Sequence, residues 1–247
     1  MKKTPGVDNV GAFNFDPSTN INTLVQNVVD KNWSLMIHTN GDEAIRLTLA
    51  SFKLAGVTSE TYELRRDRLE HASLLTDDHL VEMKQLGISP SFLIGHVGYW
   101  GWAFQQTILG EDRANHLDRC QSAINHGMRI TLHSDNGVTP LGPLRMMEQA
   151  ISRVMEGAPQ QATPAVLREQ ERISRFAALK AATYDAAWQC HADQWVGSLV
   201  AGKCADFIIL ADSPLTYDSA DKNNPVKGMR DIPVLETWKG GRKVYSS

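Results

Sequence analysis

Residues 33–45 read Trp-Ser-Leu-Met-Ile-His-Thr-Asn-Gly-Asp-Glu-Ala-Ile, and the pattern of this stretch decides the fold. A mostly apolar run leads into His38, a polar turn follows, and a helical pattern then continues over Ala44–Phe52. This order predicts a buried strand, a β/α loop, and a helix that Asn40 or Asp42 could cap. Because ligands collect at the carboxyl ends of strands in parallel β/α folds, His38 is a candidate site residue.

Strand and helix alternate in the same way along the next part of the chain. Two further strands end near comparable side chains: His71 follows one of them, and His133 and Asp135 follow another. Repeated alternation of this kind predicts parallel β/α units. The other predicted strands are Arg66–Glu70, Ile88–Ile94 and Met128–Leu132, and the predicted helices are Ile21–Lys31, Asp78–Leu86, Glu111–His126, Pro143–Glu156 and Pro164–His191, the last of which could be broken.

The chain changes character toward its C-terminus. A turn leads into an apolar strand at Phe207–Leu210, and Val234–Tyr245 contains the pair Gly240-Gly241, which is a two-residue hairpin signal. No helical pattern separates these β elements, so they predict a small separate sheet packed against the β/α part. The predicted domains are residues 1–195 for the β/α part and residues 196–247 for the β part.

The composition fits a soluble globular protein, with 42% hydrophobic and 21% charged residues among 247. The formal net charge of −3 is small, and no cluster of Lys and Arg predicts nucleic-acid binding. No apolar run approaches the roughly 20 residues that span a bilayer, and no apolar segment of a signal peptide follows the opening Met-Lys-Lys. We therefore expect a cytoplasmic or periplasmic protein without membrane contact. The three cysteines lie far apart and predict buried thiols.

His38, His71 and Asp135 share one placement, the end of a predicted β/α strand. Imidazole and carboxylate groups are ligands that zinc and similar divalent ions take, and ligands from several strands converge at the mouth of a barrel. Each histidine alone is weak evidence, because a histidine at a strand end is more often a hydrogen-bonded structural residue. Together the three predict a divalent metal site, where Asp135 could also take a proton from the attacking water. Glu70 is expected to face the opposite side of its strand and to be structural.

Three further residues each have two open interpretations. His133 lies two residues before Asp135 on the same face of a strand, so it either supports the metal site or is a satisfied core histidine. His96 and Trp100 belong to a loop rich in glycine and aromatic residues, which forms either a wall of the substrate site or a plug that closes the barrel end. We treat His96, Trp100 and His133 as candidate substrate-binding residues.

Four motifs resemble those of the amidohydrolase superfamily, specifically its YtcJ-like branch, amidohydrolase family 3. His38–Ile45 resembles an H-A-x-G-D-x-A-I stretch, Leu69–Ala72 resembles I-E-H-A, and His133–Asp135 resembles G-S-D. Gly197–Phe207 is similar to the G-S-L…G-K-x-A-D-[FL] pattern of the family's composite β domain. The motifs occur in the family's order and span most of the chain. This order also resembles exoenzyme regulatory proteins of the AepA type, which belong to the same branch.

The resemblance implies a metal-dependent hydrolase that acts on a non-peptide C–N bond of a small molecule, such as an amide, a cyclic amide or a formamide. It implies that His38 and His71 bind one metal ion. It also implies that Asp135 binds the other ion and serves as general base for the attacking water. The expected cofactor is one or two divalent ions, with zinc as the expected metal.

The chain departs from the family pattern at the start of the barrel. The family begins with an H-x-H pair and usually adds a carboxylated lysine or another acidic bridge, but this chain contains no H-x-H. The resemblance therefore implies an α/β fold that comprises the C-terminal half of a (β/α)8 TIM-type barrel, about four β/α units, followed by a small β-sandwich segment. Both edge strands would be open, so we expect the missing N-terminal half or a homo-oligomer to cover them.

Two other functions remain open on the same scaffold. The first is an inactive relative that keeps the fold as a regulatory or binding module. The second is different metal chemistry, such as isomerisation or decarboxylation. Retention of His38, His71 and Asp135 together favours hydrolysis over a decayed site, and the substrate itself cannot be predicted from these residues.

Overall fold

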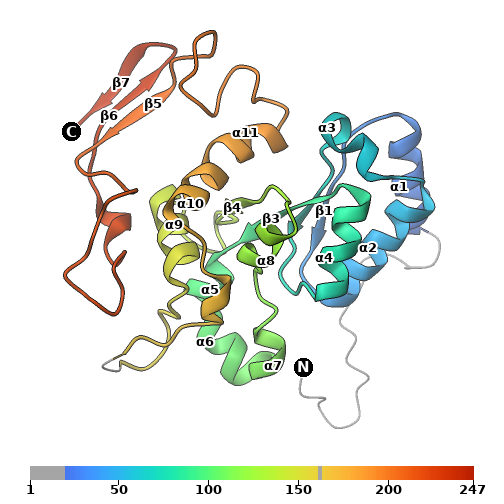
Figure 1. Cartoon of the computed structure of the whole chain (residues 1–247), viewed down its shortest axis with the longest axis horizontal. Helices are drawn as coiled ribbons and strands as arrows, with labels where there is room; N and C mark the ends of the chain where they lie inside the picture. The colour runs from blue at the N-terminus through green and yellow to red at the C-terminus, as the bar shows by residue number, and fades with distance from the viewer. Residues whose placement is uncertain (1–19, 161–162) are drawn as a thin grey trace.

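The computed structural model describes residues 20–160 and 163–247. Within these residues, four strands form a parallel sheet in the order β1-β2-β3-β4, with helices packed along it (Figure 1). Helical segments connect each strand to the next, which confirms the predicted parallel β/α units. The strands are β1 (Met36–Thr39), β2 (Arg68–His71), β3 (Ser89–Leu93) and β4 (Thr131–His133).

The helices precede the first strand, lie in the connections and follow the last strand of the parallel sheet. They are α1 (Asn20–Asp30), α2 (Asp42–Leu54), α3 (Tyr62–Arg65), α4 (Asp77–Leu86), α5 (Gly95–Gly98), α6 (Gly101–Ala103), α7 (Glu111–Ala114), α8 (Cys120–Asn125), α9 (Pro143–Ser152), α10 (Arg175–Ala182) and α11 (Tyr184–Gln189). In the part of the chain that the structure describes, none of them has the length and apolar character that a membrane crossing requires.

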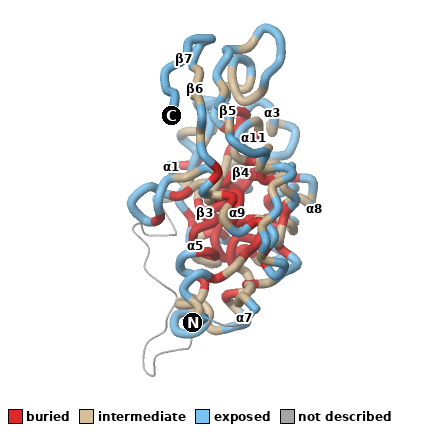
Figure 2. Tube along the Cα trace, turned by 90° about the vertical axis from the view of Figure 1, so that its left-hand side faces the viewer, coloured by how far each residue is buried: buried red, intermediate tan, exposed pale blue. Residues whose placement is uncertain are grey.

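The core lies between the sheet and the helices on its outer face. Ile45, Leu49 and Phe52 recur at helical spacing along α2 and are fully buried, as are Leu69 of β2 and Phe92 of β3. Burying each of these side chains contributes about 1.5–3 kcal/mol to folding. Figure 2 shows this buried interior concentrated around β3, β4 and α9. The strands are therefore held from behind, and their carboxyl ends are fixed relative to one another.

Two sequence predictions about helices are wrong. The helix predicted over Glu111–His126 is two short helices, because Asp118 takes a left-handed φ of 45° and its backbone N–H donates to Ser73 O over 2.9 Å. This tertiary hydrogen bond replaces the helical one. The cap of α2 also differs: its N-cap is Gly41, and no side chain caps it.

The strand predicted to be buried, β1, is exposed on one side. Its Met36 is 60% exposed, although the pattern of the stretch predicted a buried strand. Within the described residues, β1 is an edge strand that pairs with β2 alone, and the inner-face side chains of the sheet border a cavity that α9 and α11 close on one side, with Met146 and Gln189 in its lining. The inner face of the sheet is therefore partly open, which is where the candidate site lies.

The C-terminal part forms a separate antiparallel sheet, as predicted. Its strands β5 (Phe207–Leu210), β6 (Val234–Lys239) and β7 (Arg242–Ser246) lie in that order, away from the parallel sheet (Figure 1). Gly240 and Gly241 have φ of 56° and 73°, which suits a hairpin turn with two left-handed residues. The described residues thus form one three-stranded sheet, which shows the predicted β-sandwich segment in part, and the boundary at residue 195 stays a prediction.

Candidate metal centre

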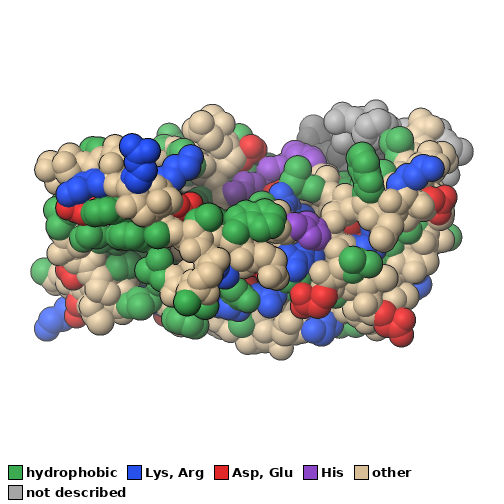
Figure 3. Space-filling model, turned by 90° about the horizontal axis from the view of Figure 1, so that it is seen from above, with side chains coloured by type: hydrophobic (Ala, Val, Ile, Leu, Met, Phe, Trp, Pro, Cys, Tyr) green, Lys and Arg blue, Asp and Glu red, His purple; other side chains and the backbone are tan. Residues whose placement is uncertain are grey.

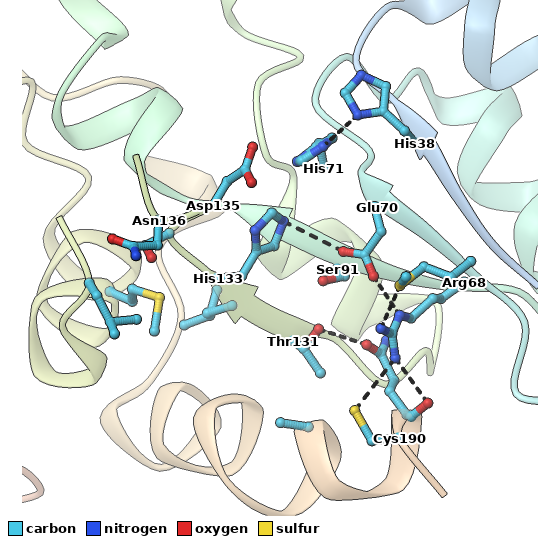
Figure 4. A pocket seen from close by; sticks show the side chains of 17 residues that line it. His38, Arg68, Glu70, His71, Ser91, Thr131, His133, Asp135, Asn136 and Cys190 are labelled. Atoms are coloured by element: carbon cyan, nitrogen blue, oxygen red, sulfur yellow. Dashed lines mark hydrogen bonds and ion pairs between the residues drawn. The ribbon is translucent and has the colours of Figure 1, made fainter. Parts of the chain in front are cut away.

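A cavity of about 630 Å³ lies over the inner face and the carboxyl ends of the parallel strands. Its lining includes His38 of β1, His71 of β2, His133 of β4 and Asp135 of the following turn (Figure 4). Figure 3 shows histidine side chains gathered near the hollow in the middle of one face of the molecule. Residues far apart in the sequence therefore meet in one place, because parallel strands end at the same edge of a sheet.

His38 and His71 are in direct contact at the mouth of the cavity. His38 Nδ1 lies 2.8 Å from His71 Nε2, and the rings meet edge to face. The pairing of β1 with β2 sets this approach, because Thr39 is the register partner of His71 and His38 is the partner of Glu70. Two imidazole nitrogens from neighbouring strands thus face each other at one place in the cavity lining.

The backbone at the ends of two strands holds the left-handed conformation. φ is 67° at His71, 46° at Ala72 and 48° at Asp135. Residues other than glycine seldom take this conformation, and such residues gather at functional sites. The turn at His71 interrupts the alternation of the strand, so Glu70 and His71 both line the cavity. The prediction that Glu70 faces away is therefore wrong.

The environment of His71 keeps its imidazole neutral. Burial, together with the neighbouring His133 and His38, lowers the pKa of His71 to about 4, whereas the Asp135 carboxylate acts in the opposite direction. At neutral pH His71 therefore carries no charge, and its Nε2 lone pair faces His38 Nδ1. A neutral imidazole is the form that binds a metal ion.

An ion pair that the sequence did not reveal crosses the inner face below the histidines. Arg68 Nε donates to Glu70 Oε1 over 2.5 Å, and Arg68 Nη1 donates to Gln189 O over 3.0 Å. His133 Nε2 lies 3.8 Å from Glu70 Oε2 (Figure 4). The sequence contained one indication of this ion pair: Arg68 and Glu70 are two residues apart, so they share one face of a strand. This placement puts His133 beneath the His38–His71 pair.

Two predicted substrate-binding residues do not line the cavity. His96 is buried on α5, where its Nδ1 lies 3.0 Å from Ser73 Oγ and its ring contacts Phe104 edge to face. Trp100 is 42% exposed and its ring contacts Tyr99. The structure therefore brings His133, but neither His96 nor Trp100, into the cavity lining, and the substrate-binding role of all three stays a prediction.

The donor set of this cavity fits a divalent ion in its chemistry. The imidazoles of His38 and His71 and the Asp135 carboxylate share the cavity, and His133 Nε2 is a buried nitrogen without a hydrogen-bond partner. The number of donors falls short: across residues 20–160 and 163–247, no group of three or more His, Cys, Asp or Glu side chains is placed to hold an ion. The metal-binding role of His38, His71 and Asp135 stays a prediction.

Comparison with known proteins places these features in a family. A family model described as "Amidohydrolase family" matches residues 4–245. Protein LONG AFTER FAR-RED 3 of Arabidopsis thaliana is 29% identical over 209 residues, which are 85% of this chain and 33% of that protein. N-substituted formamide deformylase of Arthrobacter pascens is 26% identical over 236 residues, which are 94% of this chain and 40% of that enzyme.

A solved structure of an uncharacterized metal-dependent hydrolase from Pyrococcus furiosus is similar with a TM-score of 0.66 and 24% identity, over 83% of this chain and 39% of that one. This likeness shows the fold: the parallel sheet is an α/β fragment of a TIM-barrel-like domain. The chain spans between 33% and 40% of the length of the curated relatives that it matches. On the family match over almost its whole length, the chain belongs to the amidohydrolase family.

Proposed function

We propose that the protein is a metal-dependent hydrolase of a non-peptide C–N bond in a small molecule, such as an amide, a cyclic amide or a formamide. The observation that carries this proposal is the contact between His38 and His71 at the mouth of a cavity that Asp135 also lines. The name of the Arthrobacter pascens relative, a formamide deformylase, supports the choice of bond. We propose zinc as the ion, since imidazole and carboxylate donors suit it.

The residues of this chain would divide the work in a simple way. His38 Nδ1 and His71 Nε2 would hold the ion, and a bound divalent ion polarises a carbonyl and makes water nucleophilic near neutral pH. Asp135 would accept a proton from the attacking water and return it to the leaving nitrogen, so that amide and water become acid and amine. Arg68 and Glu70 would hold His133 beneath the reacting centre.

We further propose that the open inner face is covered in the active protein. A catalytic zinc ion normally has three protein ligands, and the described residues place two imidazoles at one point. The remaining donors would come from a second half-barrel, supplied either by further sequence of the same protein or by a second copy of this chain. The three-stranded sheet β5–β7 would then be part of a composite β-sandwich.

A regulatory or binding role is the second candidate function. The shortage of donors in the described residues favours it, and the name of the Arabidopsis thaliana relative states no reaction. In that case His38 and His71 would be remnants of a site, and no complement would restore turnover.

The test is metal content and turnover of this chain alone and joined to an upstream half-barrel, on formamides, amides and cyclic amides. We expect metal and turnover to appear together in the longer protein and to disappear in His38→Ala. His126→Ala, which removes a histidine outside the cavity, is the matched control. A longer protein that holds metal stoichiometrically but hydrolyses none of these compounds would favour the regulatory role.

A further inference from the structure

A chain of hydrogen-bonded side chains leads from the candidate metal ligand His38 into the core. Asn40 Nδ2 lies 3.3 Å from His38 Nε2, Ser73 Oγ lies 3.0 Å from Asn40 Oδ1, and His96 Nδ1 lies 3.0 Å from Ser73 Oγ. Ser73 and His96 are buried, with exposures of 3% and 8%. These hydrogen bonds thus connect the end of β1, the loop after β2, and α5.

In the structure, each of these side chains donates its hydrogen bond to the next one, in the order His96, Ser73, Asn40, His38. The Asn40 amide nitrogen donates to His38 Nε2, so the single proton of a neutral His38 is on Nδ1, where it is shared with His71 Nε2 at 2.8 Å. The Ser73 hydroxyl donates to Asn40 Oδ1, which leaves His96 Nδ1 to donate to Ser73. Every donor therefore points from His96 toward His71.

When His38 binds a divalent ion, the donors and acceptors of these hydrogen bonds must be reversed. The ion takes the lone pair of Nδ1, so the proton of His38 must be on Nε2, and Asn40 must then present its oxygen. A half-turn of the amide does this, and it places Nδ2 against Ser73 Oγ. The Ser73 hydroxyl then donates to His96 Nδ1, and the hydrogen bonds that link the four side chains are all kept.

We propose that Asn40 and Ser73 are positioning residues that set the tautomer of His38, and that the Asn40 amide turns over when His38 binds a divalent ion. This inference rests on the metal role of His38 proposed above. Asn40 is exposed, so its amide is free to turn. Ser73 is buried with one hydroxyl hydrogen, so its direction follows the amide and carries the change to His96.

Substitutions of Asn40 distinguish the two arrangements of donors and acceptors. In Asn40→Asp the carboxylate only accepts, so it fixes the His38 proton on Nε2 and we expect Zn²⁺ binding as tight as in the wild type or tighter. In Asn40→Leu neither direction is supported, and we expect Zn²⁺ affinity to fall about 10–100-fold. Asn136→Asp is the matched control, because it adds the same charge to the cavity lining on the side away from β1 (Figure 4).

The readout is ¹⁵N NMR of histidine-labelled full chain, with Zn²⁺ affinity measured by calorimetry. We expect the His38 proton to move from Nδ1 to Nε2 when Zn²⁺ is added to the wild type, and to be on Nε2 without Zn²⁺ in Asn40→Asp. Ser73→Ala should weaken Zn²⁺ binding less than Asn40→Leu and should remove the tautomer change at His96.

Three results would overturn the inference. The first is the same His38 tautomer in the Zn²⁺-free wild type and in Zn²⁺-free Asn40→Asp, and the second is wild-type Zn²⁺ affinity in Asn40→Leu. The third is Zn²⁺ binding that tightens in Asn40→Asp by no more than it tightens in Asn136→Asp, when both variants bind more tightly than the wild type. If the wild type binds no Zn²⁺ at His38, the proposed metal role fails by itself. The His38 tautomer in Zn²⁺-free Asn40→Asp then still decides the positioning role. Asn40→Asp keeps the exposed position polar, so this decisive variant does not depend on the folding of Asn40→Leu.

Discussion

Asp135 combines an uncommon backbone conformation with a place in the cavity lining. Its φ of 48° is tolerated better by Asp and Asn than by most residues, because their short polar side chains bond locally. The turn that follows is fixed by the hydrogen bond from Val138 N to Asp135 O, at 2.8 Å. The backbone of this turn therefore places the Asp135 carboxylate in the cavity lining.

We predict that Asp135→Asn lowers kcat about 10²–10⁴-fold in the protein with a completed barrel. The amide keeps the shape and the left-handed φ but accepts no proton. Steady-state kinetics on the best substrate, with metal content measured in the same samples, check this. An unchanged kcat at equal metal content would exclude Asp135 as the general base.

His96 makes the stability of the fold depend on pH. Burial lowers its pKa to about 4 from the usual 6.5, so between these values the unfolded chain binds a proton that the folded chain does not. The free energy of unfolding should therefore fall as the pH falls from 6.5 to 4, by up to about 1.4 kcal/mol per pH unit for this residue.

The matched measurement is denaturant unfolding of the wild type and His96→Gln between pH 7 and pH 4.5. We expect the variant to lose less stability over this range, since glutamine does not take up the proton. Parallel curves for the two proteins would show that His96 is not the source of the slope.

The segment between α7 and α8 contains a buried carboxyl group, that of Asp118, without hydrogen-bond partners. Asp118 is fully buried, neither of its carboxyl oxygens has a hydrogen-bond partner, and burial raises its pKa well above the usual value. The folded chain therefore binds a proton that the unfolded chain has lost. Stability falls as the pH rises above about 3.9, toward the raised pKa.

We predict that Asp118→Asn stabilises the protein at pH 7 by about 1–3 kcal/mol, because it removes the cost of a buried ionisable group and tolerates a φ of 45°. The gain should shrink as the pH is lowered. Denaturant midpoints at pH 7 and pH 5 give both quantities, and Asp112→Asn on the exposed side of α7 is the control. A gain of equal size at both pH values would contradict this explanation.

Strands and their ends could be predicted from the sequence because apolar runs and turn residues are local signals. The same signals placed His38, His71 and Asp135 at one edge of a sheet, and the structure brings them to one cavity. That Glu70 and His71 both face the cavity could not be predicted, because the side on which His71 lies depends on its own left-handed φ. The break at Asp118 depends on a hydrogen bond to a residue 45 positions away, which no local pattern contains.

For the molecule as a whole, we predict that this chain alone binds metal weakly and hydrolyses little. Two imidazoles hold an ion poorly and position its water unreliably, since a catalytic zinc ion normally has three protein ligands. The open face also favours self-association, because β1 and β4 are edge strands and Met36 is exposed. Metal analysis, turnover and light scattering of the purified chain measure the three effects.

Stoichiometric metal with full turnover in a monomer of this chain would refute the half-site argument. It would mean that other side chains complete the site, with His96 and His133 as the first to test. Addition of an upstream half-barrel should otherwise restore metal, turnover and the monomeric state together.

The register between β1 and β2 has a consequence for how this protein could be altered. The separation of His38 and His71 is set by neighbouring strands that pair residue for residue, and not by the path of the chain through α2 and α3. That path could be shortened, exchanged with the loop of a relative, or opened for a circular permutation while the two imidazoles keep their spacing. Selectivity could thus diverge in the loops while the metal-facing geometry is inherited unchanged.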